Sequence, residues 1–282
     1  MRKLKNFIIA PLVILIAGFI MSLDLKKAEA GLTQAIPFYP QAFQGVHLFD
    51  DFVTGLVNIN FPISSLGWGF VANGGGGILG ANIGSVPNGV VGRVGILAMS
   101  TGSTSNATGQ PIISLPSAAM YAGQAAYTIQ WSLQVPTTLS TSGVEYGIEG
   151  GIGTYPYENS GNGIGIQYVR TVSTNWSGYS INNGTNNTTP CTTSDSAHFA
   201  VTAGAWYNFK IVMPIAGTSA SLYVAPGGSQ AYVLLCTISD HLPDISNQAY
   251  PFMDIYKISS TTTPRVMNVD WFQLDATFAA NR

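Results

Sequence analysis

Two glutamates lie close together in Val144-Glu-Tyr-Gly-Ile-Glu-Gly150, and paired carboxyl groups are the chemistry that hydrolyses glycosidic bonds. Retention needs the two carboxyl groups about 5 Å apart, and inversion needs them roughly 6.5–9.5 Å apart. If this segment is a strand, Glu145 and Glu149 share one face, but four steps of ~3.3 Å separate them by ~13 Å. We therefore expect two solvated strand carboxylates, with a catalytic Glu145–Glu149 pair as the alternative.

Metal ligation has weaker support in the sequence. No second ligand stands at metal spacing from any of the three histidines, His47, His198 and His241. Asp50, Asp51 and Asp270 would meet near one edge if the first and last strands pair, and carboxylate oxygens are ligands for Ca²⁺. We expect no cofactor, and calcium at these three aspartates is the one alternative.

Four aromatic residues lie in or beside segments rich in Gly and Asn, where a role in the core is less obvious. Aromatic rings in exposed loops can stack on sugar rings. The alternative is that they are ordinary strand aromatics buried inside the fold. The residues that we consider for ligand binding are Tyr155, Tyr157, Trp176 and Tyr179.

The chain has two cysteines, Cys191 and Cys236. In an oxidising compartment they can form one disulfide, and two buried free thiols are the alternative. Closing a loop of this length would stabilise the fold by about 4 kcal/mol on the chain-entropy model.

Residues 1–30 have the features of a secretory signal peptide. A basic start precedes an apolar run from Phe7 to Leu23, and Ala28-Glu29-Ala30 then supplies a small-x-small cleavage pattern. We expect cleavage between Ala30 and Gly31, with an uncleaved membrane anchor as the alternative. The sequence thus predicts a secreted or cell-surface protein with no membrane segment after cleavage.

Charge narrows the range of partners. Removal of residues 1–30 takes away five of the eleven basic residues and two of the thirteen acidic ones, which leaves six and eleven and a net charge of −5. Six scattered cations cannot build the basic face that several phosphates require, which argues against nucleic acid and anionic membranes. An extracellular glycan or surface polymer fits this composition better, and self-association through strand edges is a further alternative.

The elements that must position these residues are β-strands. From residue 50 onward the hydrophobic pattern has a period of two, interrupted by turn residues about every ten positions. In the clearest strand, 127–135, Tyr, Ile, Trp, Leu and Val alternate with Thr, Gln and Ser. Similar runs are found at 93–99, 163–172, 206–213, 220–225, 231–238, 253–258 and 266–274. We expect an extended N-terminal arm over residues 31–49 and one all-β domain over 50–282.

Four segments together resemble a known fold family. They are Asp50-Asp51-Phe52, the run 97–109 (LAMSTGSTSNATG), the run 203–211 (AGAWYNFKI) and Val269-Asp-Trp-Phe272. Their order resembles concanavalin A-like (laminin-G-like) jelly rolls, especially those of phage and virion structural proteins, although this chain carries an export signal. The resemblance implies two antiparallel sheets packed face to face, with the Trp206 strand inside and the last strand pairing near the first.

This fold alone does not determine a function, because its members bind glycans, decorate virions or hydrolyse polysaccharides. The glutamate spacing does not match the Glu-x-Asp-x-x-Glu pattern of the laminarinase-like members. We therefore predict a secreted or surface-associated, non-catalytic structural or adhesive module that binds a glycan or matrix. The alternatives are an extracellular polysaccharide hydrolase or lyase, and a self-assembling extracellular or virion subunit.

Overall fold

A computed structural model of the chain describes residues 45–52, 66–73, 77–82, 95–105, 109–115, 118–154, 161–182, 185–186, 191–192, 195–243 and 248–278. The expected signal peptide, its cleavage site and most of the expected arm lie outside these ranges. All that follows concerns the unit that begins at Gln44.

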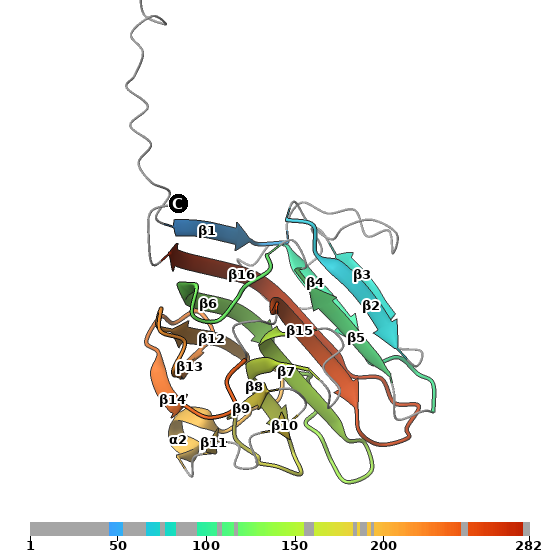
Figure 1. Cartoon of the computed structure of the whole chain (residues 1–282). Coiled ribbons are helices and arrows are strands. Elements are labelled where there is room, and N and C mark those ends of the chain that lie inside the picture. The colour runs from blue at the N-terminus through green and yellow to red at the C-terminus, as the bar shows by residue number, and fades with distance from the viewer. Residues whose placement is uncertain are drawn as a thin grey trace, which may run out of the picture. The chain divides into compact units, whose positions relative to one another are not determined.

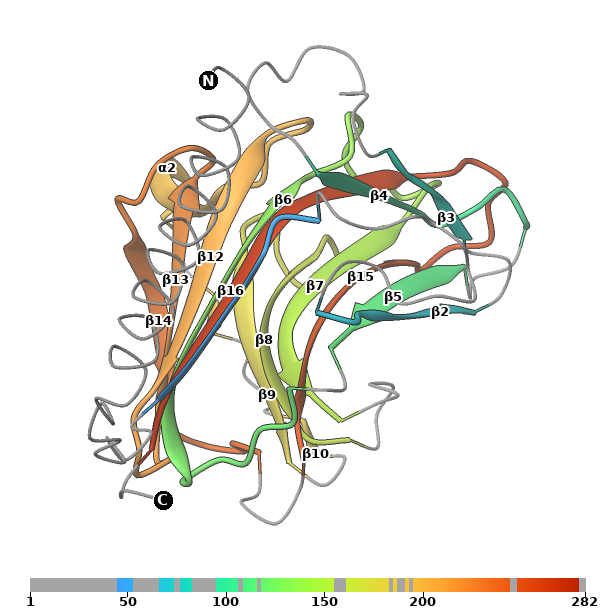
Figure 2. The same ribbon diagram turned by 90° about the horizontal axis from the view of Figure 1, so that it is seen from above.

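The strands form two antiparallel sheets that face each other (Figures 1 and 2). The first, the β16 sheet, has the order β14-β13-β12-β6-β16-β4-β3, and β1 also pairs with β16. The second, the β7 sheet, has the order β10-β9-β8-β7-β15-β5-β2, and β11 also pairs with β9. The two-sheet sandwich predicted from the sequence is therefore confirmed.

The strands of the two sheets have the following bounds. The β16 sheet consists of β1 (Gly45–Asp50), β3 (Gly77–Asn82), β4 (Ile96–Ser100), β6 (Ala125–Gln134), β12 (Trp206–Met213), β13 (Ala220–Pro226), β14 (Val233–Ile238) and β16 (Val266–Phe278). The β7 sheet consists of β2 (Gly69–Asn73), β5 (Gln110–Ser114), β7 (Tyr146–Gly153), β8 (Gly163–Val169), β9 (Ser177–Asn182), β10 (Thr185–Asn186), β11 (Cys191–Thr192) and β15 (Tyr250–Lys257). The short helix α2 (Ser196–Phe199) begins at the N-cap Asp195.

Strand β6 shows why alternation produces this architecture. Tyr127, Ile129, Trp131 and Leu133 are each at most 5% exposed, as the period of two predicts for a face that packs on a core. The residues that alternate with them lie on the opposite face of β6 and are mostly half-buried, because that face points away from the other sheet. The predicted strand at 127–135 is thus confirmed.

The first and last strands pair as expected. Strand β1 runs antiparallel to β16 from Gly45 opposite Thr277 to Asp50 opposite Phe272. Residues 45–49, which the sequence analysis placed in the arm, are part of this strand. Strand β12, which begins at Trp206, lies inside the sheet between β13 and β6.

Aromatic rings fill the space between the sheets. Trp131 of β6 stacks on Phe209 of β12, with ring centroids 5.3 Å apart. Trp176, just before β9 in the other sheet, meets Phe209 edge-on at 4.7 Å. Contacts of this kind bury large apolar areas and hold the two sheets in one relative position.

A disulfide between Cys191 and Cys236 joins the two sheets, as the sequence analysis expected. Cys191 lies on β11 of the β7 sheet and Cys236 on β14 of the β16 sheet, with their Cα atoms 6.1 Å apart. A Cβ atom on Gly178 of β9 would lie 3.0 Å from the sulfur of Cys236, so the bridge packs closely against that strand. A disulfide of this kind is compatible with an extracellular location.

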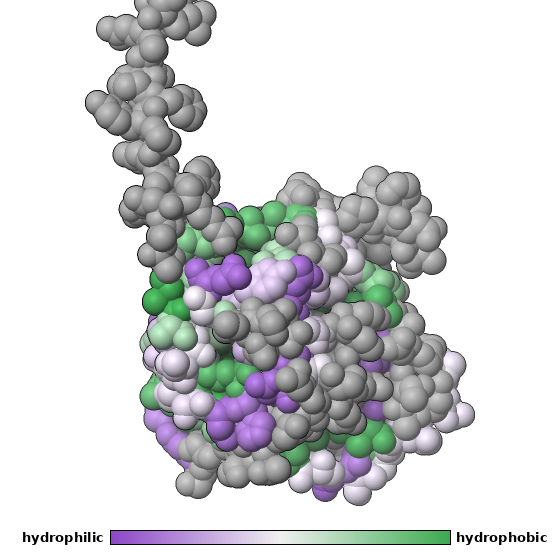
Figure 3. Space-filling view, viewed as in Figure 1, coloured by the Kyte–Doolittle hydropathy of each residue, from purple (hydrophilic) through white to green (hydrophobic). Residues whose placement is uncertain are grey.

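The surface is mixed in character. On the face seen in Figure 3, hydrophobic and hydrophilic residues alternate in small areas over the part that is coloured. Within the described ranges, no helix has the length and hydropathy required to cross a membrane.

Replacing Cys191 and Cys236 by serine is expected to lower the free energy of unfolding by about 4 kcal/mol, because the bridge closes a loop with a sequence separation of 45. Urea unfolding of the oxidised protein and of the double variant measures this difference. Treatment with a reducing agent should bring the unmodified protein to the stability of the variant. A loss below about 1 kcal/mol would show that the bridge contributes little.

Candidate functional site

The strands of the β7 sheet curve so that the face turned away from the other sheet is the concave one (Figure 2). Strand β7 lies between β15 and β8 in this sheet. Its residues Tyr146, Ile148 and Ile152 belong to the core. By the alternation of a strand, Glu149 therefore points to the concave face.

The Glu149 carboxylate is held by two tyrosines, one on each oxygen. The Tyr256 hydroxyl of β15 donates to Oε1 at 2.8 Å, and the Tyr179 hydroxyl of β9 donates to Oε2 at 3.3 Å. The two rings reach Glu149 from opposite sides of β7. They fix the orientation of a half-buried acid.

Glycines make room for both rings. Gly147 is opposite Tyr256 in the register of β7 and β15, and a Cβ atom on this glycine would overlap the Tyr256 ring. Gly165 of β8 is opposite Tyr179, and a Cβ atom there would lie 2.8 Å from ring atoms Cε1 and Cζ. Glycine inside a strand often marks such a close approach. The Tyr179 ring must cross β8 to reach Glu149, and Gly165 leaves that path open.

Burial shifts the proton affinity of this acid. Desolvation raises the pKa of Glu149 above its ordinary value of 4.5, and the hydrogen bonds from Tyr256 and Tyr179 lower it by less. Glu149 therefore keeps its proton to a higher pH than a solvated glutamate. A carboxyl group in this state can donate a hydrogen bond or a proton.

A second carboxyl group lies on the neighbouring strand. Asp254 of β15 is directly opposite Glu149 in the register, and it is 1% exposed. The Gln110 side chain of β5 donates from Nε2 to Asp254 Oδ2 at 2.6 Å. Side chains directly opposite on antiparallel strands have Cβ atoms about 4.5–5.5 Å apart. Two differently held carboxyl groups thus occupy adjacent positions on the concave face.

Gln167 of β8 is opposite Glu149 on the other side. Gln167, Glu149 and Asp254 thus form one row across β8, β7 and β15. The phenol groups of Tyr256 and Tyr179 lie beside this row, at Glu149. Such groups form hydrogen bonds with hydroxyl-rich ligands, and carboxyl pairs also provide acid–base chemistry.

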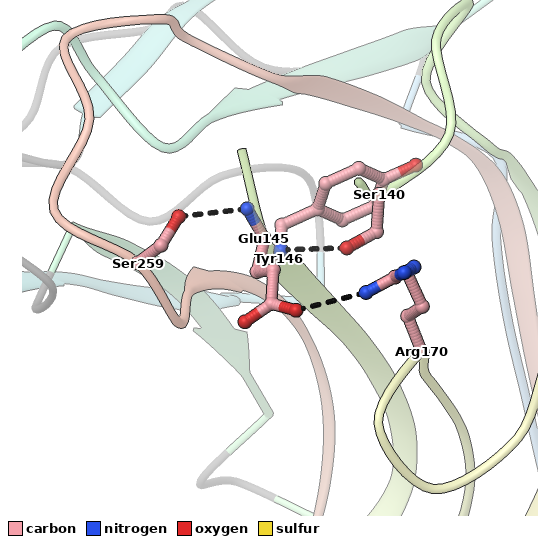
Figure 4. A network of polar contacts seen from close by, with 5 residues as sticks. All are labelled: Ser140, Glu145, Tyr146, Arg170 and Ser259. Carbon is pink, nitrogen blue, oxygen red and sulfur yellow. Dashed lines mark hydrogen bonds and ion pairs between the residues drawn. The ribbon is translucent and has the colours of Figure 1, made fainter. Parts of the chain in front are cut away.

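Glu145 is not part of this row. It precedes β7, where Arg170 Nη1 donates to its Oε1 at 3.1 Å (Figure 4). Its backbone N–H donates to Ser259 Oγ, and the next residue, Tyr146, donates from its N–H to Ser140 Oγ. These contacts join three loops at one end of the sandwich. The structure does not bring Glu145 beside Glu149, because Glu145 stands in the loop before β7 and pairs with Arg170, whereas Glu149 lies four residues further along, within the strand.

The aromatic residues considered for binding have different positions. Trp176 is 1% exposed and contacts Tyr207 and Phe209, so its ring cannot stack on a sugar. Tyr179 lies on the concave face and contacts Glu149. Tyr155 and Tyr157 lie outside the described residues.

Of the three aspartates considered for calcium, Asp50 and Asp270 have defined places in the fold. Asp50 accepts the N–H of Phe52 at Oδ1 and the Trp68 indole N–H at Oδ2, so its carboxylate supports the adjoining turn. Asp270 lies at the bulge of β16 between Val269 and Trp271. Across the ranges that the structure describes, no three His, Cys, Asp or Glu side chains are grouped so that they could hold a metal ion.

Sequence reasoning missed Asp254, Gln110 and Tyr256. Asp254 lies within the predicted strand at 253–258, but nothing local shows that it faces Glu149, which is more than a hundred residues away. The glycines of β7 and β8 were the available signal, because glycine in a strand marks close approach by another group.

Comparisons with known proteins identify the fold. No protein-family model matches the chain, and no curated protein matches its sequence. Among solved structures, a protein of unknown function from Shewanella oneidensis MR-1 has a TM-score of 0.59 at 14% identity, over 84% of this chain and 89% of that one.

Two plant lectins are also similar. The acidic lectin of winged bean, solved with methyl-α-D-galactose, has a TM-score of 0.54 at 8% identity, over 84% of this chain and 100% of that one. Lectin I of Ulex europaeus, solved with the methyl glycoside of α-L-fucose, has a TM-score of 0.53 at 9% identity with the same coverage. At these identities the likeness shows the fold, which is a concanavalin A-like jelly roll.

The raised pKa of Glu149 predicts how its replacement changes stability with pH. Since the folded protein holds this proton more tightly than the unfolded chain, the stabilisation is complete below the ordinary value of 4.5 and is lost as pH rises through the folded-state pKa. Glu149→Gln keeps a neutral side chain at every pH. The free energy of unfolding of the variant, relative to that of the unmodified protein, should therefore increase as pH rises from 4.5 to 8.

Urea unfolding at a series of pH values measures this difference. Glu145→Gln is the matched control, because it removes a partly exposed ion pair worth less than about 1 kcal/mol. A Glu149→Gln difference that is constant with pH would contradict the raised pKa.

Proposed function

We propose that this protein is an exported glycan-binding module and that the concave face of the β7 sheet is its binding surface. The observation that carries the proposal is the fixed carboxyl group of Glu149 between Tyr256 and Tyr179 on this face. Sugars are bound by planar polar side chains together with aromatic rings, and this row supplies both.

The groups around Glu149 support a neutral or weakly charged ligand. Gln167 and Gln110 add amides to the same face of the sheet. Within the described part of the row no lysine or arginine stands beside Glu149 in the register, so the row has no cation for a phosphate or sulfate group. Two of the similar structures are lectins solved with simple methyl glycosides, which makes a carbohydrate ligand a natural first test.

Export is the other half of the proposal. The signal features of residues 1–30 and the Cys191–Cys236 disulfide both fit a protein that works outside the cytoplasm. We infer cleavage after Ala30 and a structural or adhesive role at the cell surface or in the surrounding matrix.

Binding should depend on the two tyrosines and on Glu149. For a polysaccharide that retains the unmodified protein, we expect Tyr179→Ala and Glu149→Gln each to raise the dissociation constant about tenfold or more, equivalent to ~1.4 kcal/mol. Affinity electrophoresis against a panel of neutral polysaccharides, followed by calorimetry, measures this loss. Glu145→Gln is the control and should bind normally. Normal binding by Tyr179→Ala and Glu149→Gln would place the binding surface elsewhere.

Polysaccharide hydrolysis is a second candidate, favoured by the position of Asp254 directly opposite Glu149. It requires that Asp254, which is 1% exposed, becomes accessible when a substrate binds. A glutamic acid with a raised pKa can act as the general acid, and a neighbouring carboxylate can act as nucleophile or base. Directly opposite residues have Cβ atoms about 4.5–5.5 Å apart, so two carboxyl groups at these positions are within reach of the separations that glycosidases use.

Release of reducing ends from the retained polysaccharide tests hydrolysis. If the pair is catalytic, Glu149→Gln and Asp254→Asn should each lower kcat by about 100-fold or more, and Glu145→Gln should leave it unchanged. Retention without any release of reducing ends between pH 4 and 8 would reject hydrolysis and leave the binding proposal standing.

A further inference from the structure

The outer face of the β16 sheet carries a continuous row of side chains across six strands. The register pairs Leu234 with Tyr223, Tyr223 with Lys210, Lys210 with Gln130, Gln130 with Gln273, and Gln273 with Phe49. The row follows the strand order β14-β13-β12-β6-β16-β1. We call these six residues the outer row.

The two ends of the outer row are apolar and exposed. Phe49 is 51% exposed and Leu234 is 48% exposed. The other large hydrophobic side chains exposed in the described ranges are Val172 and Ile215, and neither lies on these strands. The outer row thus ends in an uncovered apolar side chain on each side.

The middle of the outer row is polar and has one charged side chain, Lys210. The Lys210 ammonium lies 4.5 Å from the ring centroid of Tyr223 and 4.4 Å from that of Tyr232. Contact with two rings stabilises this ammonium where it is partly removed from water. Gln130 and Gln273 follow as neutral amides, which can both donate and accept hydrogen bonds.

From this order we propose that the outer face of the β16 sheet binds a second copy of this chain. In this dimer the outer faces of the two β16 sheets face each other. A twofold axis lies between them, parallel to the strands and midway between β12 and β6. The order of the outer row is therefore reversed in the second copy. Leu234 then faces Phe49 of the second copy, Tyr223 faces Gln273, and Lys210 faces Gln130. Apolar ends meet apolar ends, and no like charges meet.

The alternative twofold axis is disfavoured by charge. An axis at right angles to the strands would place Lys210 opposite Lys210 of the second copy, and like charges in a partly desolvated interface are repulsive. Both axes keep the strands of the two sheets nearly aligned, which is one of the two usual arrangements of stacked sheets, so charge distinguishes them. The same surface patch is used on both copies, as a closed dimer requires.

The size of the face predicts a weak dimer. Five steps of ~4.8 Å between strands give a width of ~24 Å, and six residues along β12 give a height of ~20 Å. This covers on the order of 500 Å² on each copy, at the low end for specific interfaces. The dimer should therefore form at high protein concentration.

A charge exchange at the two ends of the outer row tests the proposal. Phe49 and Leu234 are about 24 Å apart within one chain, so charges placed there interact little unless two copies meet. We expect Phe49→Lys with Leu234→Lys to raise the dissociation constant at least tenfold. Phe49→Lys with Leu234→Glu should restore most of the association, because opposite charges then face each other.

Sedimentation equilibrium of the purified exported protein at low ionic strength measures these constants. Val172→Lys is the matched control for adding a lysine at an exposed apolar position, and it should leave association unchanged. Circular dichroism confirms that each variant is folded.

Three results would overturn the proposal. They are a monomer at every concentration, equal association by the two double variants, and loss of retention on a polysaccharide in Phe49→Lys with no change in association. The last result would assign the face to a glycan. Glu149→Gln should not change association, so this test is independent of the proposed binding surface on the β7 sheet.

Discussion

The candidate site depends on the close approach of two tyrosine rings to the backbone of the β7 sheet. Tyr256 and Tyr179 can reach Glu149 because Gly147 and Gly165 have no side chains in their path. The register of β7 with β15 and that of β8 with β9 bring each ring to its glycine, and the first of these also places Asp254 opposite Glu149. A shift by one residue would turn Glu149 toward the core and remove all of these contacts.

The same strand connects the site to the core. On its inner side, a Cβ atom on Gly150 would lie 2.7 Å from Nε1 of Trp131, so the indole lies directly against β7. Trp131 also stacks on Phe209 of β12. Glycine on both faces of β7 lets large rings pack closely from either side. These contacts fix the position of the strand that carries Glu149.

Most of the fold could be predicted from the sequence, because alternation reports which face of a strand is buried. The strands at 127–135 and 206–213 and the pairing of the first and last strands are confirmed. Strand β7 was harder, since its four glycines in eight residues resemble a loop more than a strand. Trp176 lies in the core although its neighbours are typical loop residues, because packing between the sheets decides its place.

The site itself was predicted only in part. Glu149 and Tyr179 were named from the sequence, but their shared contact depends on β8 lying between their strands. Asp254 and Gln110 come together through pairing of β15 with β5, over a sequence separation of 144 residues. Local patterns contain no information on such a register, which is set by the packing of whole sheets.

Nuclear magnetic resonance of the protein with ¹³C-labelled tyrosine tests the central claim most directly, because it observes the rings beside Glu149 while a sugar is added. Titration with oligosaccharides from a retained polysaccharide should shift the ring signals of Tyr179 and Tyr256 and leave that of the core residue Tyr146 unchanged. Saturable binding that shifts neither Tyr179 nor Tyr256 would contradict the account.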